Sequence, residues 1–341
     1  MFKEAPYLNS PVVGSVDELF ELVAVLKELG DRASEAPPPT LGWREGAGSD
    51  CSYYEVSRDS AEPPRDVHGL DSHTVLVEFE GVTAIVATGA LVGRSSAVVP
   101  GVPARWLGVR LNFRGPVELP DKLYHRSEIL GRLFDADFDL EAARDEMRYH
   151  VEEALARAWD GGGTLLVDGP IFRALDVIQR GGDYAVLYTE VARRRAEMFR
   201  GKRAIGVVKR VDQSTYLARC VGAGSDDEVV AKRLLDDSPG FVGPVEVRWG
   251  DMTKYLYYVG APSAKGIRVF RVEALELDLA REAASWLSRL ADAEGVPLPI
   301  RAADRLARRL NASAVKLLYA ASPVEPTYRG LEAVEAALRE L

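Results

Sequence analysis

A short strand that ends in a forced turn constrains this chain more than any other stretch. Residues 164–167 (Thr-Leu-Leu-Val) are apolar or β-branched without polar alternation, which predicts a strand buried on both faces of a sheet. Asp168-Gly169-Pro170 follows directly and forces the chain to turn. A carboxylate there is fixed by the strand yet reachable from solvent, and α/β enzymes commonly build their sites at such strand ends. Asp168 is therefore a candidate catalytic residue; the alternative is that its side chain only stabilises the turn.

Composition and charge describe an ordinary folded protein. Hydrophobic residues make up 47% of the 341-residue chain, enough for a substantial core in one large domain or two unequal lobes. The net charge of −9 argues against non-specific coating of nucleic acid, although it leaves room for a local basic channel. The two cysteines, Cys51 and Cys220, indicate neither a metal site nor a disulfide framework. Because no apolar run is long enough to span a bilayer, we expect a cytoplasmic protein without membrane contact.

The order of the expected elements indicates an α/β fold with a mixed sheet. An irregular, Pro- and Gly-rich stretch at 33–68 precedes two strands at 74–80 and 82–88, which join at Glu80-Gly81. The other expected strands are 106–113, 164–167, 204–209, 245–249, 255–260, 268–273 and 314–318. The expected helices are 15–29, 139–159, 184–200, 275–290, 299–310 and 330–341.

The absence of common catalytic motifs excludes several classes of enzyme. The sequence contains no phosphate loop, no G-x-G-x-x-G after a strand, no H-E-x-x-H and no G-x-S-x-G. The chain has only four histidines, which argues against histidine-rich zinc sites. Carboxylates at strand ends and on helices remain, and their oxygen atoms suit Mg²⁺ or Mn²⁺ in phosphodiester cleavage.

Three groups of residues, in the same order along the chain, resemble the NurA nuclease family. Val167-Asp168-Gly169-Pro170, followed by Gly206-Val207-Val208-Lys209-Arg210, is similar to its paired strand motifs. The segments 254–259 and 267–273 are similar to its late strand pair, and 296–307 resembles its closing helix motif. The resemblance covers the chain between Val75 and Leu318 and depends on the ordered set rather than on any single motif.

This resemblance implies an RNase H-like core, with a mixed central sheet flanked by helices and with peripheral N- and C-terminal helices. It implies a Mn²⁺-dependent (or Mg²⁺-dependent) nuclease that resects DNA 5′ ends in double-strand break repair. It also implies a homodimer that docks on a hexameric HerA-type ATPase. We accordingly expect an N-terminal helix and irregular extension (1–73), a nuclease core (74–320) and a C-terminal helix (321–341).

The family's site uses an early Asp-Gly-Ser aspartate, a helix glutamate, the Asp-Gly-Pro aspartate, and a tyrosine and a histidine near the C-terminus. Asp168 matches the third of these, and its implied role is to bind metal and to orient the attacking water. Glu152 is our choice for the helix glutamate, with Glu146 and Glu153 as alternatives. Glu152 and Glu146 both lie roughly 120° from the apolar stripe of their helix, on opposite sides, so the helical wheel does not separate them. Each of the three is otherwise a solvated helix charge.

Three positions depart from the family pattern. No Asp-Gly-Ser follows the first expected strand; Glu80 is the nearest equivalent, and Glu78 on the same strand face is the fallback. Both glutamates are otherwise ordinary solvent-facing strand residues. Asp304 stands where the family has histidine and offers an oxygen ligand instead, whereas Val296 stands where the family has tyrosine and offers no hydrogen bond. The predicted metal ligands are Asp168, Glu152, Glu80 and Asp304.

Basic residues suggest where DNA would bind. Lys209, at the end of its strand, is expected to contact the scissile phosphate, although a plain surface lysine is the alternative. The densest basic cluster of the chain predicts a DNA path, unless its cations only complement the end of a helix. The predicted DNA-binding residues are Arg193, Arg194, Arg195, Arg200, Lys202, Arg203 and Arg210.

The sequence therefore favours a metal-dependent DNA end-processing nuclease that acts with a hexameric ATPase. The alternative is a catalytically weak or inactive family member that binds DNA and the ATPase as an adaptor. Convergence of the carboxylates of Glu80, Asp168 and Asp304 to metal-bridging distance would favour the enzyme. A Glu80 side chain that points to solvent would favour the adaptor.

Overall fold

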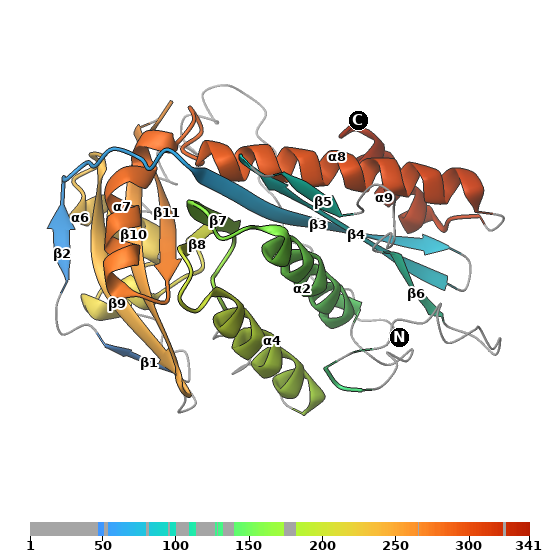
Figure 1. Ribbon diagram of the computed structural model, residues 1–341, viewed down its shortest axis with the longest axis horizontal. Coiled ribbons are helices and arrows are strands. Elements are labelled where there is room, and N and C mark those ends of the chain that lie inside the picture. The colour runs from blue at the N-terminus through green and yellow to red at the C-terminus, as the bar shows by residue number, and fades with distance from the viewer. Residues whose placement is uncertain are drawn as a thin grey trace, which may run out of the picture.

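A mixed β-sheet with helices on both faces organises the molecule (Figure 1). The computed structural model describes residues 47–50, 54–79, 82–94, 96–99, 109–113, 127, 129–131, 140–173, 182–264, 266–322 and 325–341. Within these residues the sheet has the strand order β1-β9-β10-β11-β8-β7-β3-β4-β5, with β2 beside β9 and β6 beside β4. The expected α/β class, a mixed central sheet flanked by helices, is confirmed.

The bounds of the elements are as follows. The strands are β1 (Ala47–Asp50), β2 (Glu55–Ser57), β3 (Val67–Phe79), β4 (Val82–Val92), β5 (Ala97–Val99), β6 (Val109–Phe113), β7 (Thr164–Asp168), β8 (Ala204–Val208), β9 (Gly240–Trp249), β10 (Met252–Ser263) and β11 (Gly266–Ala274). The helices are α2 (Leu140–Ala158), α4 (Asp183–Phe199), α5 (Tyr216–Cys220), α6 (Asp227–Leu234), α7 (Leu277–Leu287), the 3₁₀ turn η2 (Ser288–Leu290), α8 (Leu298–Ala321) and α9 (Tyr328–Leu338).

Strand β7 lies in the middle of the sheet and is buried on both faces, as its sequence predicts. Its first four residues have no exposed surface. Leu165 belongs to the hydrophobic core that α2 and α4 cover, whereas Leu166 belongs to the core under α7. β7 pairs in parallel with β3 on one side and with β8 on the other. Such a central parallel strand needs apolar residues on both faces, which explains the missing alternation.

Helices α2 and α4 cover one face of the sheet, and α8 with α9 covers the β3–β4 part of the other (Figure 1). On the α8 face, Val77 and Val86 of the sheet pack against Val315 of α8 and Val334 of α9. The side-chain amide of Asn311 donates hydrogen bonds to the backbone oxygens of His73 (3.2 Å) and Val86 (3.0 Å). Helix α8 is therefore fixed to both strands by apolar contacts and by buried polar contacts.

Two expected boundaries are wrong. Residues 314–318, expected as a last strand, lie inside the 24-residue helix α8. Alanine-rich flanks and apolar residues at helical spacing outweigh the β-branched Val315. Strand β3 begins at Val67 rather than at residue 74, so its first half includes Gly69, Asp71 and Ser72, which have low strand propensity. Pairing with β7 and burial between two layers stabilise this half of the strand in spite of its composition.

Three further expectations concern residues away from the central strands. Cys220 is disulfide-bonded, which contradicts the expectation of unpaired cysteines; Cys51 lies outside the described residues. The helix expected at 15–29 also lies outside them. In the part of the chain that the structure describes, no helix combines the length and the apolar character needed to cross a membrane.

Close approach of α8 to β3 at Gly69 gives the first prediction. A Cβ atom at residue 69 would lie 2.0 Å from the backbone oxygen of Pro299, at the start of α8. Gly69→Ala should therefore displace α8 and lower the free energy of unfolding by about 1–3 kcal/mol. Urea unfolding measures this change, with Ala302→Ser on the exposed side of α8 as the control. Wild-type stability in Gly69→Ala would contradict the close packing of these two elements.

Candidate metal centre

Three aspartates from three elements converge at the carboxyl end of β7. Asp71 of β3, Asp168 of β7 and Asp304 of α8 each offer one carboxylate oxygen, and the three oxygens lie within 4.8 Å of one another. Among the described residues this is the group of His, Cys, Asp and Glu side chains whose arrangement suits a metal ion. Oxygen-only ligands at this spacing are typical of sites for hard divalent cations.

Strand register explains how Asp71 and Asp168 come together. In the parallel pair β3–β7, Leu70 lies opposite Val167, so the next residues on the two strands are Asp71 and Asp168. Asp304 arrives from the second turn of α8, whose beginning contacts β3 at Gly69. The close approach of α8 that a glycine permits is therefore what adds the third carboxylate.

Cations from separate elements border the three carboxylates. The Lys209 ammonium, just after β8, donates a hydrogen bond to Asp168 Oδ2 at 2.6 Å. Arg308, one turn after Asp304 on α8, donates to Asp304 Oδ1 at 2.9 Å. The backbone N–H of Ser72 donates to Asp71 Oδ1 at 2.7 Å. Lys209 therefore lies beside Asp168, and its contact with the scissile phosphate stays a prediction.

Burial and mutual repulsion perturb the acids unequally. Burial raises the pKa of Asp71 well above its usual range, and the charges of Asp168 and Asp304 raise it further. Burial likewise raises the pKa of Asp168, although the adjacent Lys209 opposes this shift. At Asp304 burial also acts upward, but the Arg308 hydrogen bond and nearby positive charge outweigh it, so its pKa is lowered. A bound cation would relieve this repulsion, so the three residues suit a metal ion.

Asp71 is the site residue that the sequence analysis missed. Glu80, predicted in its place, lies outside the described residues. The fallback, Glu78, is absent from the carboxylate group, and its side chain is 37% exposed and lies 3.7 Å from Arg329. A signal was available: Asp71-Ser72 keeps the first and last residues of the family's Asp-Gly-Ser. Our strand boundary at residue 74 placed it outside the sheet.

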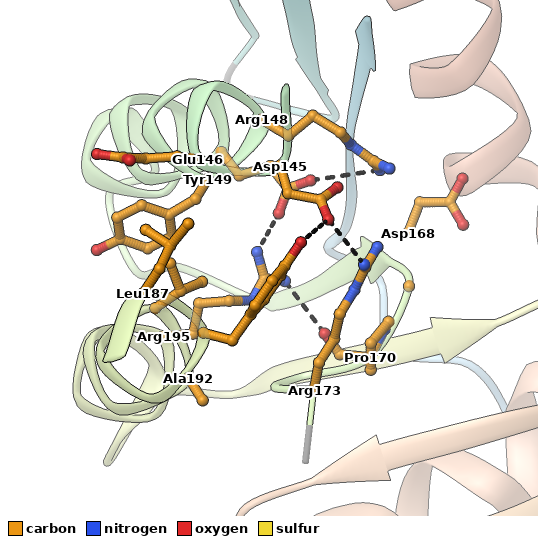
Figure 2. A pocket seen from close by; sticks show the side chains of 14 residues that line it. Asp145, Glu146, Arg148, Tyr149, Asp168, Pro170, Arg173, Leu187, Ala192 and Arg195 are labelled. Carbon is orange, nitrogen blue, oxygen red and sulfur yellow. Dashed lines mark hydrogen bonds and ion pairs between the residues drawn. The ribbon is translucent and has the colours of Figure 1, made fainter. Parts of the chain in front are cut away.

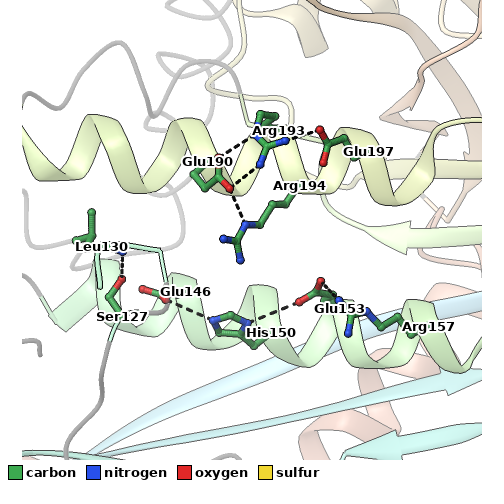
Figure 3. A network of polar contacts seen from close by, with 10 residues as sticks. All are labelled: Ser127, Leu130, Glu146, His150, Glu153, Arg157, Glu190, Arg193, Arg194 and Glu197. Atoms are coloured by element: carbon green, nitrogen blue, oxygen red, sulfur yellow. Dashed lines mark hydrogen bonds and ion pairs between the residues drawn. The ribbon is translucent and has the colours of Figure 1, made fainter. Parts of the chain in front are cut away.

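None of the three candidate helix glutamates belongs to this carboxylate group. Glu152 is buried and forms an ion pair with Arg195. Glu153 accepts a hydrogen bond from Arg157, and Glu146 lies 3.4 Å from the His150 ring (Figure 3). The prediction of Glu152 as a metal ligand therefore has no support in this geometry.

The predicted DNA-binding arginines on α4 are largely occupied within the protein. Arg193 and Arg194 form hydrogen bonds with Glu190, and Arg193 also pairs with Glu197 (Figure 3). Arg195 points inward, and only 9% of its side chain is exposed. Its assignment to a DNA-binding surface is therefore wrong, because a buried guanidinium cannot reach a phosphate.

The remaining predicted cations lie at two opposite ends of β8. Arg200, Lys202 and Arg203 precede this strand, and Arg203 pairs with Glu282. Arg210 follows the strand directly after Lys209 and is exposed. Since Asp168 lies at the carboxyl end of the parallel strands, Arg210 is near the carboxylates and the first three are about 15 Å away along the strand.

A pocket between α2 and α4 opens beside Asp168 (Figure 2). Tyr149, Leu187 and Ala192 form part of its wall, and Arg148 extends along it from α2 toward Asp168. At its floor Arg195 approaches Pro170, which follows the strand end (Figure 2). Asp168 thus lines a cleft that combines apolar side chains with charged side chains of both signs.

Buried charges hold the turn that follows Asp168. The backbone N–H of Ile171 donates to Glu273 Oε2 at 3.0 Å, and Lys254 Nζ donates to the Phe172 oxygen at 2.7 Å. Lys254 also pairs with Glu273 at 2.7 Å, and burial lowers its pKa to about 8 despite that partner. Lys254 lies in β10 and Glu273 in β11. The late strand pair therefore acts on the site by holding the turn after Asp168 in place.

Comparison with known proteins decides the family. The sequence model of the NurA domain matches residues 65–309, which contain all three aspartates. The chain belongs to the NurA family. This NurA-family chain is similar in structure to the NurA nuclease from Sulfolobus solfataricus, with 14% identity, 89% of this chain and 92% of that chain covered, and a TM-score of 0.47. A search of curated proteins gave no match.

Two further solved NurA structures contain ligands. One is NurA with manganese, at 8% identity, 91% and 99% coverage of the two chains and a TM-score of 0.46. The other is NurA bound to dAMP and manganese, at 10% identity, 84% and 90% coverage and a TM-score of 0.41. Val296, which the resemblance places where the family has tyrosine, packs beside the core under α7.

The raised pKa of Asp71 gives a prediction for the metal-free protein. Because the folded state raises this pKa, deprotonation destabilises the fold, and stability is lost as the pH rises from the unfolded value of about 4 through the folded pKa. Asp71→Asn removes this penalty and should raise the free energy of unfolding at pH 7 by about 1 kcal/mol. Chemical unfolding between pH 4 and 8 measures the difference between the two proteins, which should grow with pH.

The exposed acid Asp251, in the turn between β9 and β10, provides the control. Asp251→Asn should leave stability within about 0.5 kcal/mol of the wild type. An Asp71→Asn protein that is less stable than wild type at neutral pH would contradict the inferred repulsion among the three carboxylates.

Proposed function

We propose that this chain is a metal-dependent nuclease that cleaves phosphodiester bonds of DNA at the Asp71, Asp168 and Asp304 centre. The observation that carries the proposal is the convergence of three carboxylates from β3, β7 and α8. Convergence to metal-bridging distance is what distinguishes the enzyme from an adaptor, and Asp71 fills the position expected for Glu80. Membership of the NurA family supports a nuclease rather than another metal-dependent activity.

The donor set favours Mn²⁺ or Mg²⁺. All three groups offer hard oxygen atoms, which suit both ions. Solved NurA structures were obtained with manganese, and we propose the same ion here. When bound, the ion would supply positive charge that polarises the phosphodiester and activates water. Asp71, Asp168 and Asp304 would hold it.

Residues around the carboxylates have roles that follow from their positions. Lys209 fixes the orientation of Asp168 through its 2.6 Å hydrogen bond, and its half-buried ammonium offers positive charge to the scissile phosphate. Arg308 fixes Asp304 in the same way. Arg210 is exposed and has no ion pair in the described part of the chain, so we propose that it binds a backbone phosphate of the DNA.

We propose that the core is RNase H-like. The strand order β6-β4-β3-β7-β8 supports this, because the first three strands are antiparallel and the last two run parallel to β3. In chain order these five strands are β3, β4, β6, β7 and β8. The first and the fourth, β3 and β7, are neighbours in the sheet, so Asp71 and Asp168 at their ends lie side by side.

The family suggests the biological setting that we propose. The nuclease would resect 5′ ends in double-strand break repair in the cytoplasm, as a homodimer that acts with a hexameric HerA-type ATPase. Support for this setting comes from membership of the NurA family alone.

Cleavage of end-labelled linear DNA with Mn²⁺ tests the proposal. We expect the wild type to cut, and Asp168→Asn or Asp71→Asn to lose at least about 100-fold in rate, because each removes a ligand charge. Asp278→Asn, an exposed acid on α7, should cut like the wild type. A wild-type protein that binds DNA or the ATPase without cutting DNA would overturn the proposed nuclease function and would support the adaptor function.

A further inference from the structure

Two residues that the sequence assigned to separate roles are paired with each other inside the protein. Glu152 of α2, predicted to bind metal, and Arg195 of α4, predicted to bind DNA, form an ion pair. Their side chains are 6% and 9% exposed. Burial of two opposite charges is unfavourable unless further hydrogen bonds satisfy both groups, so their other contacts indicate what the pair does.

Those other contacts lead to the two strands that carry the aspartates. Ser72, the residue after Asp71, donates its hydroxyl to Glu152 Oε1 at 2.6 Å. Arg195 donates to the backbone oxygen of Pro170 at 3.1 Å (Figure 2) and to that of Ile171, also at 3.1 Å, in the turn that follows Asp168. The pair thus connects β3 beside Asp71 with the chain just beyond Asp168.

We propose that Glu152 and Arg195 form a buried brace that sets the positions of Asp71 and Asp168, so that both are positioning residues and not a metal ligand and a DNA contact. This inference depends on the proposed metal centre. In other metal sites, residues that do not touch the ion form hydrogen bonds to its ligands and fix their orientation. The brace would fix the ends of the two strands in the same way.

The occupancy of the Glu152 carboxylate supports a brace over a ligand. One oxygen accepts from Ser72 and the other from Arg195, and Arg148 lies 3.7 Å away. Burial alone would raise the pKa of Glu152, but the charges of Arg195 and Arg148 and the Ser72 hydrogen bond lower it. If Glu152 moved to a metal, the Arg195 guanidinium would lose its counter-charge in a buried site.

A second element, β11, also holds the turn beyond Asp168. Glu273 accepts from the N–H of Ile171 while Arg195 donates to the oxygen of the same residue. Buried charges from β11 and α4 therefore bind both polar groups of one peptide residue. A buried ion pair that only joined α2 to α4 would not need these contacts, which lie within three residues of Asp71 or Asp168.

Mn²⁺ affinity of the full chain, measured without DNA by calorimetry or by electron paramagnetic resonance of free Mn²⁺, tests the brace. Arg195→Met should weaken binding about tenfold at a temperature well below unfolding, because the turn loses two anchors. Arg195→Lys, which can still donate to Glu152 or to one carbonyl oxygen, should recover part of the loss. Arg194→Met, the adjacent arginine that pairs with Glu190 on the same helix, should bind like the wild type.

A double-mutant cycle separates a brace from independent effects. Glu152→Gln should weaken Mn²⁺ binding about tenfold, and adding Arg195→Met should weaken it little further, because the two residues act as one unit. Independent effects would multiply to about a hundredfold. Glu153→Gln, one position along α2, is the control and should leave the affinity unchanged.

The results that would contradict the brace can be told apart. If Glu152 binds the metal, Arg195→Met frees its carboxylate, and the affinity stays equal or rises while Glu152→Gln lowers it. If the pair only stabilises the fold, Arg195→Met lowers the melting temperature and leaves the affinity unchanged. Either result overturns the brace. A wild type that binds no Mn²⁺ overturns the metal centre itself. Should Arg195→Met fail to fold, Arg195→Lys and Glu152→Gln give the same comparison.

Discussion

Parallel pairing of β3 with β7 is the constraint on which the rest of the centre depends. Its register places Asp71 directly beside Asp168, so two like charges lie on neighbouring strands in a buried part of the sheet. Burial raises the pKa of both acids, and neighbouring carboxylates add to the shift, from Asp168 and Asp304 at Asp71 and from Asp304 at Asp168. Ionising these acids in the folded protein therefore carries an electrostatic cost. Proteins accept such a cost at functional sites, where the surrounding structure determines the geometry.

The surrounding elements supply what the strand pair lacks. Lys209 after β8 and Arg308 on α8 contribute positive charge, and α8 contributes the third carboxylate. Helix α8 reaches this place because Gly69 leaves room for its first turn and because Asn311 binds the strand backbone further along. Four elements of different sequence position therefore meet at one strand end, and the loss of any one contact would affect the whole group.

Charged residues serve the interior of this protein as much as its surface. Arg195 of α4 and Lys254 of β10 are both buried, and both donate to backbone oxygens of the turn after Asp168. On the exposed side of α4, Arg193 and Arg194 are neutralised by glutamates of their own helix. Among the described residues, Arg193, Arg194 and Arg195 are therefore engaged within the protein, whereas Arg210, close to the carboxylates, is exposed.

The sequence by itself determined the central strand, the turn after it, the α/β class and the family, and it named Asp168 and Asp304 as candidate ligands. These follow from local features: an apolar run, an Asp-Gly-Pro turn and an ordered set of motifs. Only the tertiary structure decided that Asp71 belongs to the centre and that Glu152 pairs with Arg195. Both depend on contacts between residues far apart in the chain, through strand register and helix packing. A segment such as Gly-Leu-Asp-Ser has low strand propensity, and its sequence alone does not show that pairing with another strand will make it part of the sheet.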